Sequence, residues 1–361
     1  MEKKIIFEGN NFITTKLIGE GGFGKVYLGK TKDTNQICAI KEIDLNKNKE
    51  RREKMIRELQ IMKKIKHKNC IELFFIEPKD YQNVDLIYVV MEYCDLGDLN
   101  GYLRTKSSIS LEEVKEIFGQ IVLGLKYLSQ KRIVHRDLKP KNILLQSNNN
   151  SKFGYTIKLA DFGFARKIPK DDLEKSLEME IQIGTPLYVA PEIFVNQSYS
   201  LKVDLWSLGA ILYELITGNP LIQYLSIKQI MFEFQNSTNK SLPDSYLEKV
   251  PKECHDLVER LLTVDPNLRI TREELYKHPF ISEKLNELIG DSNTKGIDQN
   301  SKKLIGIAKI DSQSDENDDN FLSFSKGDEV EIIEIDGKMG IGKLNGKKGE
   351  IFINDFDIKE N

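Results

Sequence analysis

The stretch His135-Arg136-Asp137-Leu138-Lys139-Pro140-Lys141-Asn142 is the most specific part of this sequence. It lies in a region, from about residue 96 to 280, where apolar residues recur at helical spacing. This region predicts a helical lobe, with the quoted stretch between two of its long helices. Two apolar stripes support the prediction, one on each side of the stretch: Val114, Phe118, Ile121, Leu125 and Leu128, then Leu205, Leu208, Leu212 and Leu215.

The region on the N-terminal side, residues 12–92, has a different pattern. Short apolar runs rich in β-branched and aromatic residues, such as 86–90, predict strands. One helix is expected among them, because Met55, Leu59 and Met62 share a helical face. The sequence therefore predicts a small β-rich lobe followed by a larger helical lobe.

A glycine-rich segment, Gly19-Glu20-Gly21-Gly22-Phe23-Gly24-Lys25-Val26, lies between two of the expected strands. Glycines at its first, third and sixth positions let backbone N–H groups approach a phosphate without obstruction by Cβ. A flexible hairpin and a dinucleotide-binding fold are alternative interpretations. The second of these needs a helix directly after the glycines, whereas a strand is expected here.

A lysine in the next expected strand, Lys41 of Cys38-Ala39-Ile40-Lys41, is within reach of such phosphates. An ordinary surface lysine is the alternative interpretation. Glu58 favours a functional lysine, because it lies next to the apolar helix face at Leu59 and can point inward to pair with Lys41.

Residues 135–142 match the HRDLKxxN catalytic loop of eukaryotic-type protein kinases, which the chain resembles from residue 12 to 280. The resemblance implies an α+β, two-lobed protein kinase fold. It also implies the use of ATP with Mg²⁺, with Mn²⁺ as an alternative metal. Further matching segments follow in the order of the family: Asp161-Phe162-Gly163, Ala190-Pro191-Glu192, Asp204-Leu205-Trp206-Ser207-Leu208-Gly209, and Arg269.

The resemblance implies a role for each matching residue. Asp137 accepts the substrate hydroxyl proton or orients that hydroxyl, and Lys139 steadies the γ-phosphate. Asn142 and Asp161 hold the Mg²⁺ ions, and Lys41 holds the α- and β-phosphates. The expected catalytic residues are Asp137, Lys139, Asn142, Lys41 and Glu58. Three further residues are expected to hold the lobe together: Glu192, Asp204 and Arg269, the last paired with Glu192.

The nucleotide pocket is placed by the same resemblance. Met91 matches the gatekeeper, Glu92 and Cys94 match the hinge that binds adenine, and Asp98 matches the ribose contact. Ordinary core packing is the alternative for the apolar members. The expected ATP-binding residues are Ile18, Gly19, Glu20, Gly21, Gly22, Phe23, Gly24, Lys25, Val26, Ala39, Lys41, Met91, Glu92, Cys94, Asp98, Leu144 and Asp161.

Two segments indicate the substrate class. Leu138-Lys139-Pro140 is the serine/threonine form of the catalytic loop, and Gly184-Thr185-Pro186 resembles the substrate-side loop of serine/threonine kinases. Lys141 stands where kinases that select arginine carry glutamate, so we expect no strong preference for arginine-rich substrates.

Phe164-Ala165-Arg166 resembles the unc-51-like, autophagy-initiating group.

Control of activity is expected in the segment 164–183. Kinases of this family that carry an arginine at the position of Arg136, directly before the catalytic aspartate, often need a phosphorylated activation loop. Ser176 is the only hydroxyl residue of the segment, and Glu178 and Glu180 lie close to it. Our hypothesis is that a carboxylate replaces the phosphate, and phosphorylation of Ser176 is the alternative.

The composition changes after residue 280. Residues 281–304 predict a polar linker, and residues 305–359 alternate short β-like runs with glycine and acidic turns. The latter resemble a Src-homology-3 domain, a small all-β barrel. Of its groove aromatics only Phe356 is kept, so proline-rich peptides are not expected to bind. A docking, regulatory or stabilising module with a protein or intramolecular partner is expected instead. The matches are Ala308-Lys309-Ile310-Asp311, 320–328 and 346–352.

The composition fits an enzyme of the cytoplasm or nucleus. Hydrophobic residues make up 40% of the chain, enough for a sizeable core, and the net charge is −3. That balance argues against a nucleic-acid-binding protein and against polybasic membrane attachment. No apolar run approaches the roughly 20 residues of a membrane span. The cysteines are scattered and are expected to be reduced thiols: Cys38, Cys70, Cys94 and Cys254.

Two other function classes compete with an active protein kinase. A signalling scaffold with an inactive kinase fold usually lacks one of Lys41, Asp137 and Asp161, and all three are present. A small-molecule kinase is disfavoured by residues 184–192, which resemble a cleft for protein substrates. We therefore predict an active protein serine/threonine kinase.

Overall fold

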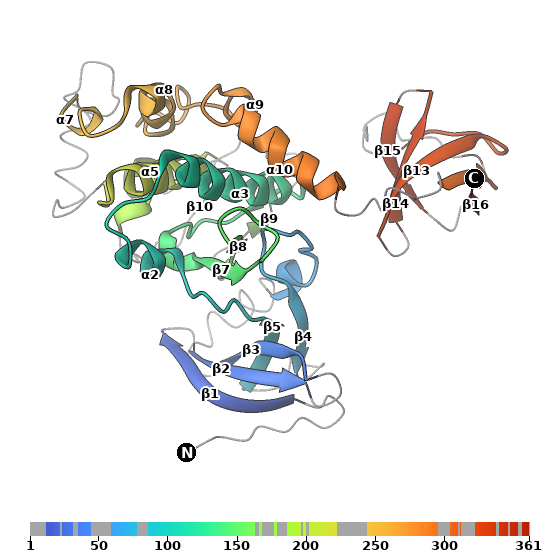
Figure 1. Ribbon diagram of the computed structural model, residues 1–361, viewed down its shortest axis with the longest axis horizontal. Coiled ribbons are helices and arrows are strands. Elements are labelled where there is room, and N and C mark those ends of the chain that lie inside the picture. The colour runs from blue at the N-terminus through green and yellow to red at the C-terminus, as the bar shows by residue number, and fades with distance from the viewer. Residues whose placement is uncertain are drawn as a thin grey trace. The chain divides into compact units, whose positions relative to one another are not determined.

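The computed structural model divides the chain into two compact units, Met1–Leu288 and Ile289–Asn361 (Figure 1). Each unit has its own hydrophobic core. The structure describes residues 12–21, 24–31, 35–44, 59–77, 86–162, 166–167, 177–178, 186–195, 198–199, 202–221, 244–294, 304–309, 311, 322–336, 339–345, 347–352 and 356–360.

The first unit begins with a five-stranded antiparallel sheet of strand order β1-β2-β3-β5-β4. Its strands are β1 (Phe12–Gly21), β2 (Gly24–Thr31), β3 (Ile37–Asp44), β4 (Leu73–Glu77) and β5 (Leu86–Glu92). Side chains alternate between faces along a strand, so Ala39, Lys41 and Ile43 of β3 share one face. The register pairs Lys41 with Val26 on one side and with Val89 on the other. The predicted β-rich lobe is therefore present, with the lysine in the middle of its sheet.

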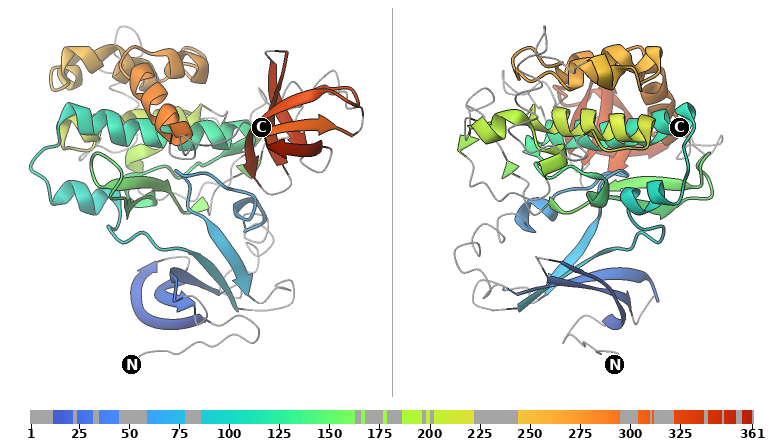
Figure 2. Two further views of the ribbon diagram at one scale, coloured as in Figure 1. Left: turned by 45° about the vertical axis from the view of Figure 1, so that its right-hand side comes forward. Right: turned by 90° about the vertical axis from the view of Figure 1, so that its left-hand side faces the viewer.

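Helices dominate the rest of the first unit, as predicted. The longest, α3, begins after Ser110, whose hydroxyl accepts a hydrogen bond from the Glu113 backbone N–H. Both predicted apolar stripes are buried, one in α3 and one in α5. These two helices run side by side, between α8 and α9 on one side and the β7–β8 hairpin on the other (Figure 2). The helices are α2 (Leu99–Arg104), α3 (Leu111–Gln130), α4 (Pro191–Val195), α5 (Val203–Thr217), α7 (Asp244–Leu247), α8 (Lys252–Leu261) and α9 (Arg272–Lys277).

A hairpin separates the two polar motifs of the helical part. Residues 135–142 lie between β6 and β7, and Asp161 follows β8. Because β7 and β8 are antiparallel, the chain returns to its starting point, and Ala160 N–H donates to the Asn142 carbonyl at 2.9 Å. The short pairs are β6 (Ile133–Val134) with β9 (Arg166–Lys167), β7 (Ile143–Ser147) with β8 (Tyr155–Leu159), and β10 (Leu177–Glu178) with β11 (Ser198–Tyr199). The 3₁₀ turns are η2 (Pro140–Asn142) and η5 (Pro186–Tyr188).

Helix α10 (Ser282–Thr294) occupies part of the segment for which the sequence predicts a polar linker. Ile281, Leu285 and Leu288 recur at i, i+4 and i+7, and all three are buried in the core of the first unit. The structure differs from the prediction because three apolar residues in a polar stretch are enough to bury one helical face.

The second unit is a five-stranded antiparallel sheet of order β15-β14-β13-β12-β16. Its first strand, β12, pairs with β13 on one side and with the last strand, β16, on the other. Val330, Ile332, Ile351 and Phe356 are buried in its core, and Phe324 packs on Phe356 with ring centroids 4.7 Å apart. The strands are β12 (Leu304–Ala308), β13 (Glu329–Asp336), β14 (Met339–Leu344), β15 (Lys347–Phe352) and β16 (Phe356–Glu360).

The predicted barrel is corrected to an open sheet. Within the described residues no ladder joins the outer strands β15 and β16. The sheet is nevertheless curled. Phe352 ends β15 and Phe356 begins β16, and four residue steps span at most about 14 Å. In a flat five-stranded sheet the outer strands would lie about 19 Å apart, so this short connection bends the sheet without closing it.

The four cysteines are free and buried, in agreement with the prediction of unpaired thiols. Burial raises their pKa, to about 11 for Cys38 and to about 12 for Cys94. None of the helices in the described ranges is long and apolar enough to cross a bilayer.

Candidate active site

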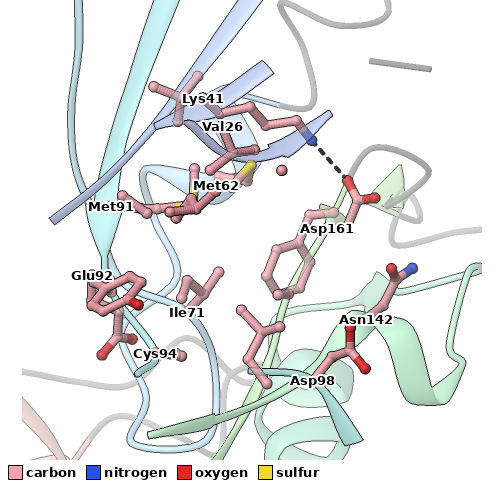
Figure 3. A pocket seen from close by; sticks show the side chains of 18 of the residues that line it. Val26, Lys41, Met62, Ile71, Met91, Glu92, Cys94, Asp98, Asn142 and Asp161 are labelled. Carbon is pink, nitrogen blue, oxygen red and sulfur yellow. Dashed lines mark hydrogen bonds and ion pairs between the residues drawn. The ribbon is translucent and has the colours of Figure 1, made fainter. Parts of the chain in front are cut away.

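A cavity of about 510 Å³ lies between the N-terminal sheet and the helical part of the first unit. This volume is within the range of roughly 300–1,000 Å³ that is typical of small-molecule sites. Figure 3 shows Lys41 and Asp161 on one side of the cavity and Glu92 and Cys94 on the other. The walls between are mainly apolar, so the cavity suits a flat apolar ring with a charged group at one end.

Lys41 and Asp161 form an ion pair at the charged end, with Nζ 3.2 Å from Oδ1 (Figure 3). Asp161 has a φ of 58°, a left-handed conformation that is uncommon outside glycine. Burial alone would raise the pKa of Asp161, but the charge and hydrogen bond of Lys41, together with the charges of His135 and Lys139, outweigh it and hold this pKa below its usual value. The carboxylate is therefore ionised at neutral pH and can bind a cation.

Asp137 is held from two sides by Lys139 and Asn142. The Lys139 Nζ lies 2.9 Å from Oδ1 and 2.8 Å from Oδ2 of Asp137. The Asn142 side-chain amide donates to the Asp137 carbonyl at 2.7 Å and to its Oδ2 at 2.8 Å. Pro140 begins η2, and this single turn brings Asn142 back to Asp137. The three side chains therefore form one fixed group.

The backbone before Asp137 is anchored by Asp204, near the start of α5. The Asp204 carboxylate accepts the backbone N–H groups of His135 and Arg136, each at 2.9 Å. The fully buried His135 ring reaches the Ala160 carbonyl at 3.0 Å, close to Asp161. Asp204 thus has the structural position that the sequence predicts.

Asn142 and Asp161 fit a magnesium ion. The Asn142 nitrogen is engaged with Asp137, which leaves its side-chain oxygen as an acceptor. An amide oxygen and an ionised carboxylate are ligands that Mg²⁺ accepts, and Mg²⁺ completes its shell with water and phosphate oxygens. No cluster of three His, Cys, Asp or Glu that could hold a metal occurs in the described part of the chain.

The opposite side of the cavity is fixed by the side chain of Glu92. Its Oε2 lies 2.8 Å from the Lys158 Nζ, and its Oε1 accepts the Glu72 backbone N–H at 2.7 Å. With its carboxylate engaged, Glu92 can contribute its backbone to the cavity. Asp98 lines the cavity and also caps α2, because its Oδ1 accepts the Gly101 N–H at 2.7 Å.

Most of the predicted nucleotide-binding residues line this cavity. They are Ile18, Gly19, Val26, Ala39, Lys41, Met91, Glu92, Cys94, Asp98, Leu144 and Asp161. Glu20 of β1 and Gly24 and Lys25 of β2 do not line it, and Gly21 is the last residue of β1. Glu58, Gly22, Phe23, Ser176, Gly184 and Thr185 lie outside the described residues. Pro186 begins η5.

Several lining residues are absent from the sequence prediction. Ile43 shares a face of β3 with Ala39 and Lys41, and Val89 shares a face of β5 with Met91, so strand periodicity could have identified both. Leu59 and Met62 belong to the apolar helix face already recognised in the sequence. The remaining additional members are Ile71, Tyr93, Asp95, Gly97, Lys141, Ala160 and Phe162.

The comparison with known families agrees with this geometry. The description "protein kinase domain" belongs to the family model that matches residues 12–281. The chain belongs to the protein kinase family. The match covers the sheet, the cavity and the helices up to the start of α10.

The similar proteins are serine/threonine kinases by name. The chain is 35% identical over 276 residues to serine/threonine-protein kinase atg1 of Dictyostelium discoideum, covering 75% of this chain and 39% of that protein. It is 34% identical over 275 residues to human serine/threonine-protein kinase ULK3, covering 75% and 55%. Human serine/threonine-protein kinase Nek5 matches at 35% over 270 residues, covering 74% and 36%. The matched segment is thus about two-fifths to one-half of each relative's length.

Proposed function

We propose that this chain is a protein serine/threonine kinase that transfers the γ-phosphate of Mg-ATP to serine or threonine hydroxyls of proteins. The observation that carries the proposal is a cavity lined by the Lys41–Asp161 pair and by Asn142, whose side-chain amide is bonded to Asp137, the ion-pair partner of Lys139. Family membership supports it, and so do the names of the similar proteins.

Phosphoryl transfer requires positioning and charge stabilisation more than covalent work by the protein. We assign Asp137 to the substrate hydroxyl, which it orients and whose proton it accepts. Lys139 and Asn142 hold that carboxylate in place and Lys139 also faces the γ-phosphate. Lys41 holds the α- and β-phosphates. Magnesium bound by Asn142 and Asp161 supplies charge neutralisation on the phosphates, with Mn²⁺ as an alternative ion.

The apolar part of the cavity is assigned to adenine. Val26, Ala39 and Leu144 lie on its walls and would sandwich the ring. Glu92 and Cys94 would bond the ring edge through their backbone, which fits the engagement of the Glu92 carboxylate by Lys158. Asp98 is assigned to the ribose.

The substrate class is proposed from the catalytic loop and from residues 184–186. Lys139 is the serine/threonine form of its position, and Thr185 would contact it and Asp137. The positive charge of Lys141, an exposed residue at the rim of the cavity, argues against selection of arginine-rich peptides. A peptide array with dominant arginine selection upstream of the target residue would overturn this point.

Activity without loop phosphorylation is a further part of the proposal. It is motivated by Glu178 and Glu180, whose carboxylates would take the place of a phosphate near Arg136. Loss of activity on phosphatase treatment, together with a mapped phosphate on Ser176, would show that phosphorylation is required instead.

The second unit is proposed to be a Src-homology-3-like module for docking or regulation. Its strand order, with the first strand between the second and the last, supports this fold together with the matching sequence segments. We do not expect this module to bind proline-rich peptides, because the groove aromatics other than Phe356 are replaced and Phe356 itself is buried. Membership of the unc-51-like group is proposed on Phe164-Ala165-Arg166, and Nek5 has the same 35% identity as atg1 over a slightly shorter match.

The test uses the full chain with ³²P-labelled Mg-ATP, a generic protein substrate and phosphoamino-acid analysis. We expect label on serine or threonine, and a loss of about 10²-fold or more in Asp137→Asn with ATP binding retained. Asp256→Asn, which changes an exposed aspartate on α8, is the matched control and should retain activity. A wild-type chain that binds Mg-ATP and transfers no phosphate would favour the inactive scaffold.

A further inference from the structure

We propose that α10 is a working part of the kinase core and that its Lys284 is a positioning residue for β8, the strand that leads into Asp161. The inference rests on the proposed function and deepens it, because the placement of β8 matters for transfer only if Asp161 holds the metal. The family match ends at residue 281, so α10 lies beyond it. Four connected contacts carry the inference.

The first contact is a close approach of α10 to α3 at Gly119. A Cβ built on Gly119 would lie 2.9 Å from the Leu288 Cδ1 and 3.3 Å from the Lys284 Cγ. A larger residue at this position would force the Leu288 side chain, and to a smaller extent the Lys284 stem, to move, because packed interiors have little spare volume. Leu285 and Leu288 are buried on the same side of α10. The surface of α3 is therefore shaped to receive this helix.

The second contact is an ion pair at that place. The Lys284 Nζ lies 3.4 Å from the Glu116 Oε2, and both side chains are 8% exposed. It also lies 2.7 Å from the Glu287 Oε2, which is 53% exposed. Burial opposes the charge of Lys284, but Glu287 and Glu116 outweigh it and raise its pKa. Glu116 thus has a charged partner that comes from α10.

The third contact connects Glu116 to Gln120, one turn further along α3. The Gln120 Nε2 donates to the Glu116 Oε1 at 2.9 Å. Its Oε1 accepts the Ile157 backbone N–H at 2.8 Å and the Asn69 Nδ2 at 3.0 Å. Only one orientation of the Gln120 amide satisfies these three bonds, with its Nε2 toward Glu116 and its Oε1 toward β8. Lys284 contacts the Glu116 Oε2 and leaves the Oε1 as the acceptor for Gln120, so this ion pair favours the orientation of Gln120 that binds β8.

The fourth contact fixes the same edge of β8, because the N–H and C=O groups of Ile157 and the N–H of Leu159 point to one side of the strand. The Asn69 Nδ2 donates to the Ile157 carbonyl at 3.0 Å, and the Asn69 carbonyl accepts the Leu159 N–H at 2.9 Å. Asn69 and Gln120 are both buried, so these bonds are shielded from water. Leu159 is two residues before Asp161. A continuous chain of buried polar contacts thus runs from α10 to the metal-binding end of β8.

The experiment compares four variants of the full chain: Lys284→Met, Gln120→Leu, Lys284→Met combined with Glu116→Gln, and Glu287→Gln. Glu287→Gln is the matched control, since it removes the exposed partner of Lys284 and leaves the buried one. Amide hydrogen exchange of the β8 peptide, Tyr155–Leu159, is measured well below the unfolding transition. The values of kcat and KM for ATP are measured on the same preparations.

We expect Lys284→Met and Gln120→Leu each to increase β8 exchange and to lower kcat by about fivefold to tenfold, with KM for ATP changed less than twofold. The double variant removes the uncompensated charge of Glu116 and should recover stability but not the kcat of the wild type. Glu287→Gln should stay within about twofold of wild type.

The inference is overturned if Lys284→Met and Gln120→Leu lower the melting temperature but leave β8 exchange and kcat unchanged, because α10 would then only add stability. A wild-type chain without phosphoryl transfer would refute the proposed function. The exchange measurement would still decide whether Lys284 positions β8.

Discussion

Glu192 of α4 and Arg269, which follows α8, form a two-bond ion pair in the core of the helical part. Nη1 lies 2.8 Å from Oε1, and Nη2 lies 2.9 Å from Oε2. The guanidinium also donates to the Thr263 and Lys202 carbonyls and lies over the Trp206 ring, 5.3 Å from its centroid. The pair therefore joins the segment before α5 to the one after α8.

Removing one charge of this pair should strongly reduce stability. Glu192→Gln leaves the fully buried Arg269 without its counter-charge, so we expect a loss of about 3–5 kcal/mol in the free energy of unfolding. Urea unfolding followed by circular dichroism measures it. The exposed pair Arg260–Glu274 is the comparison, and Glu274→Gln should cost less than about 1 kcal/mol. Equal losses in the two variants would contradict this expectation.

Acid should destabilise the first unit through His67. Burial, with the nearby Lys68 and Lys158, lowers the pKa of His67 to about 4, and its Nδ1 accepts the Asn69 N–H at 3.1 Å. The unfolded state takes up a proton near pH 6.5, before the folded state does. The contribution of neutral His67 to the free energy of unfolding is therefore complete above about pH 6.5. It decreases by about 2–3 kcal/mol as the pH falls toward 4.

The measurement is the free energy of unfolding between pH 4 and 7 for the wild type and for His67→Gln. We expect a shallower dependence on pH in the variant. Parallel curves would mean that His67 is protonated equally in both states.

Two glycines of the same hairpin should respond differently to alanine. Gly24 has a φ of +133°, and a Cβ there would lie 1.8 Å from the Glu42 carbonyl oxygen, so Gly24→Ala must displace the backbone. At Gly19 the nearest atom to an added Cβ is the Val26 Cβ, at 3.8 Å. We expect Gly24→Ala to lower the melting temperature. Gly19→Ala should change the free energy of unfolding by no more than about 1 kcal/mol, as at a compatible glycine site, and so should shift the melting temperature little. Differential scanning fluorimetry decides between them.

Cys94 should resist alkylation although it lines the cavity. Burial raises the pKa of its thiol to about 12, so the reactive thiolate is scarce at pH 7–8. Peptide mapping after iodoacetamide treatment should find Cys94 unmodified in the folded chain and modified in urea. Rapid labelling of the native chain at pH 7 would contradict this prediction.

The kinase architecture could be predicted because its signals are local. The stripes of α3 and α5 follow helical periodicity, and Asp137, Lys139 and Asn142 lie within six residues of one another. Contacts over long sequence distances could not be predicted in the same way. Lys158 does not stand out in the sequence, and only the fold brings it to Glu92. Likewise, the sequence of α10 is mainly polar because Glu283, Asn286 and Glu287 are exposed, and the packing of the helix depends on space left by Gly119 of α3, which is distant in the sequence.

The open sheet of the second unit differs from the predicted barrel for a related reason. The matching segments predict a small all-β fold, but closure depends on whether β15 and β16 form a ladder, and nothing in the alternation of their residues encodes that contact.

The pairing of β12 with β16 also has a consequence for engineering. Leu304 lies opposite Glu360 in this ladder, so the two ends of the sheet, the first residue of β12 and the last residue of β16, are neighbours. Directly opposed residues of antiparallel strands lie only about 4.5–5.5 Å apart. A sheet of this kind can be inserted into a surface loop of another protein, because its first and last residues are separated by only a few ångströms.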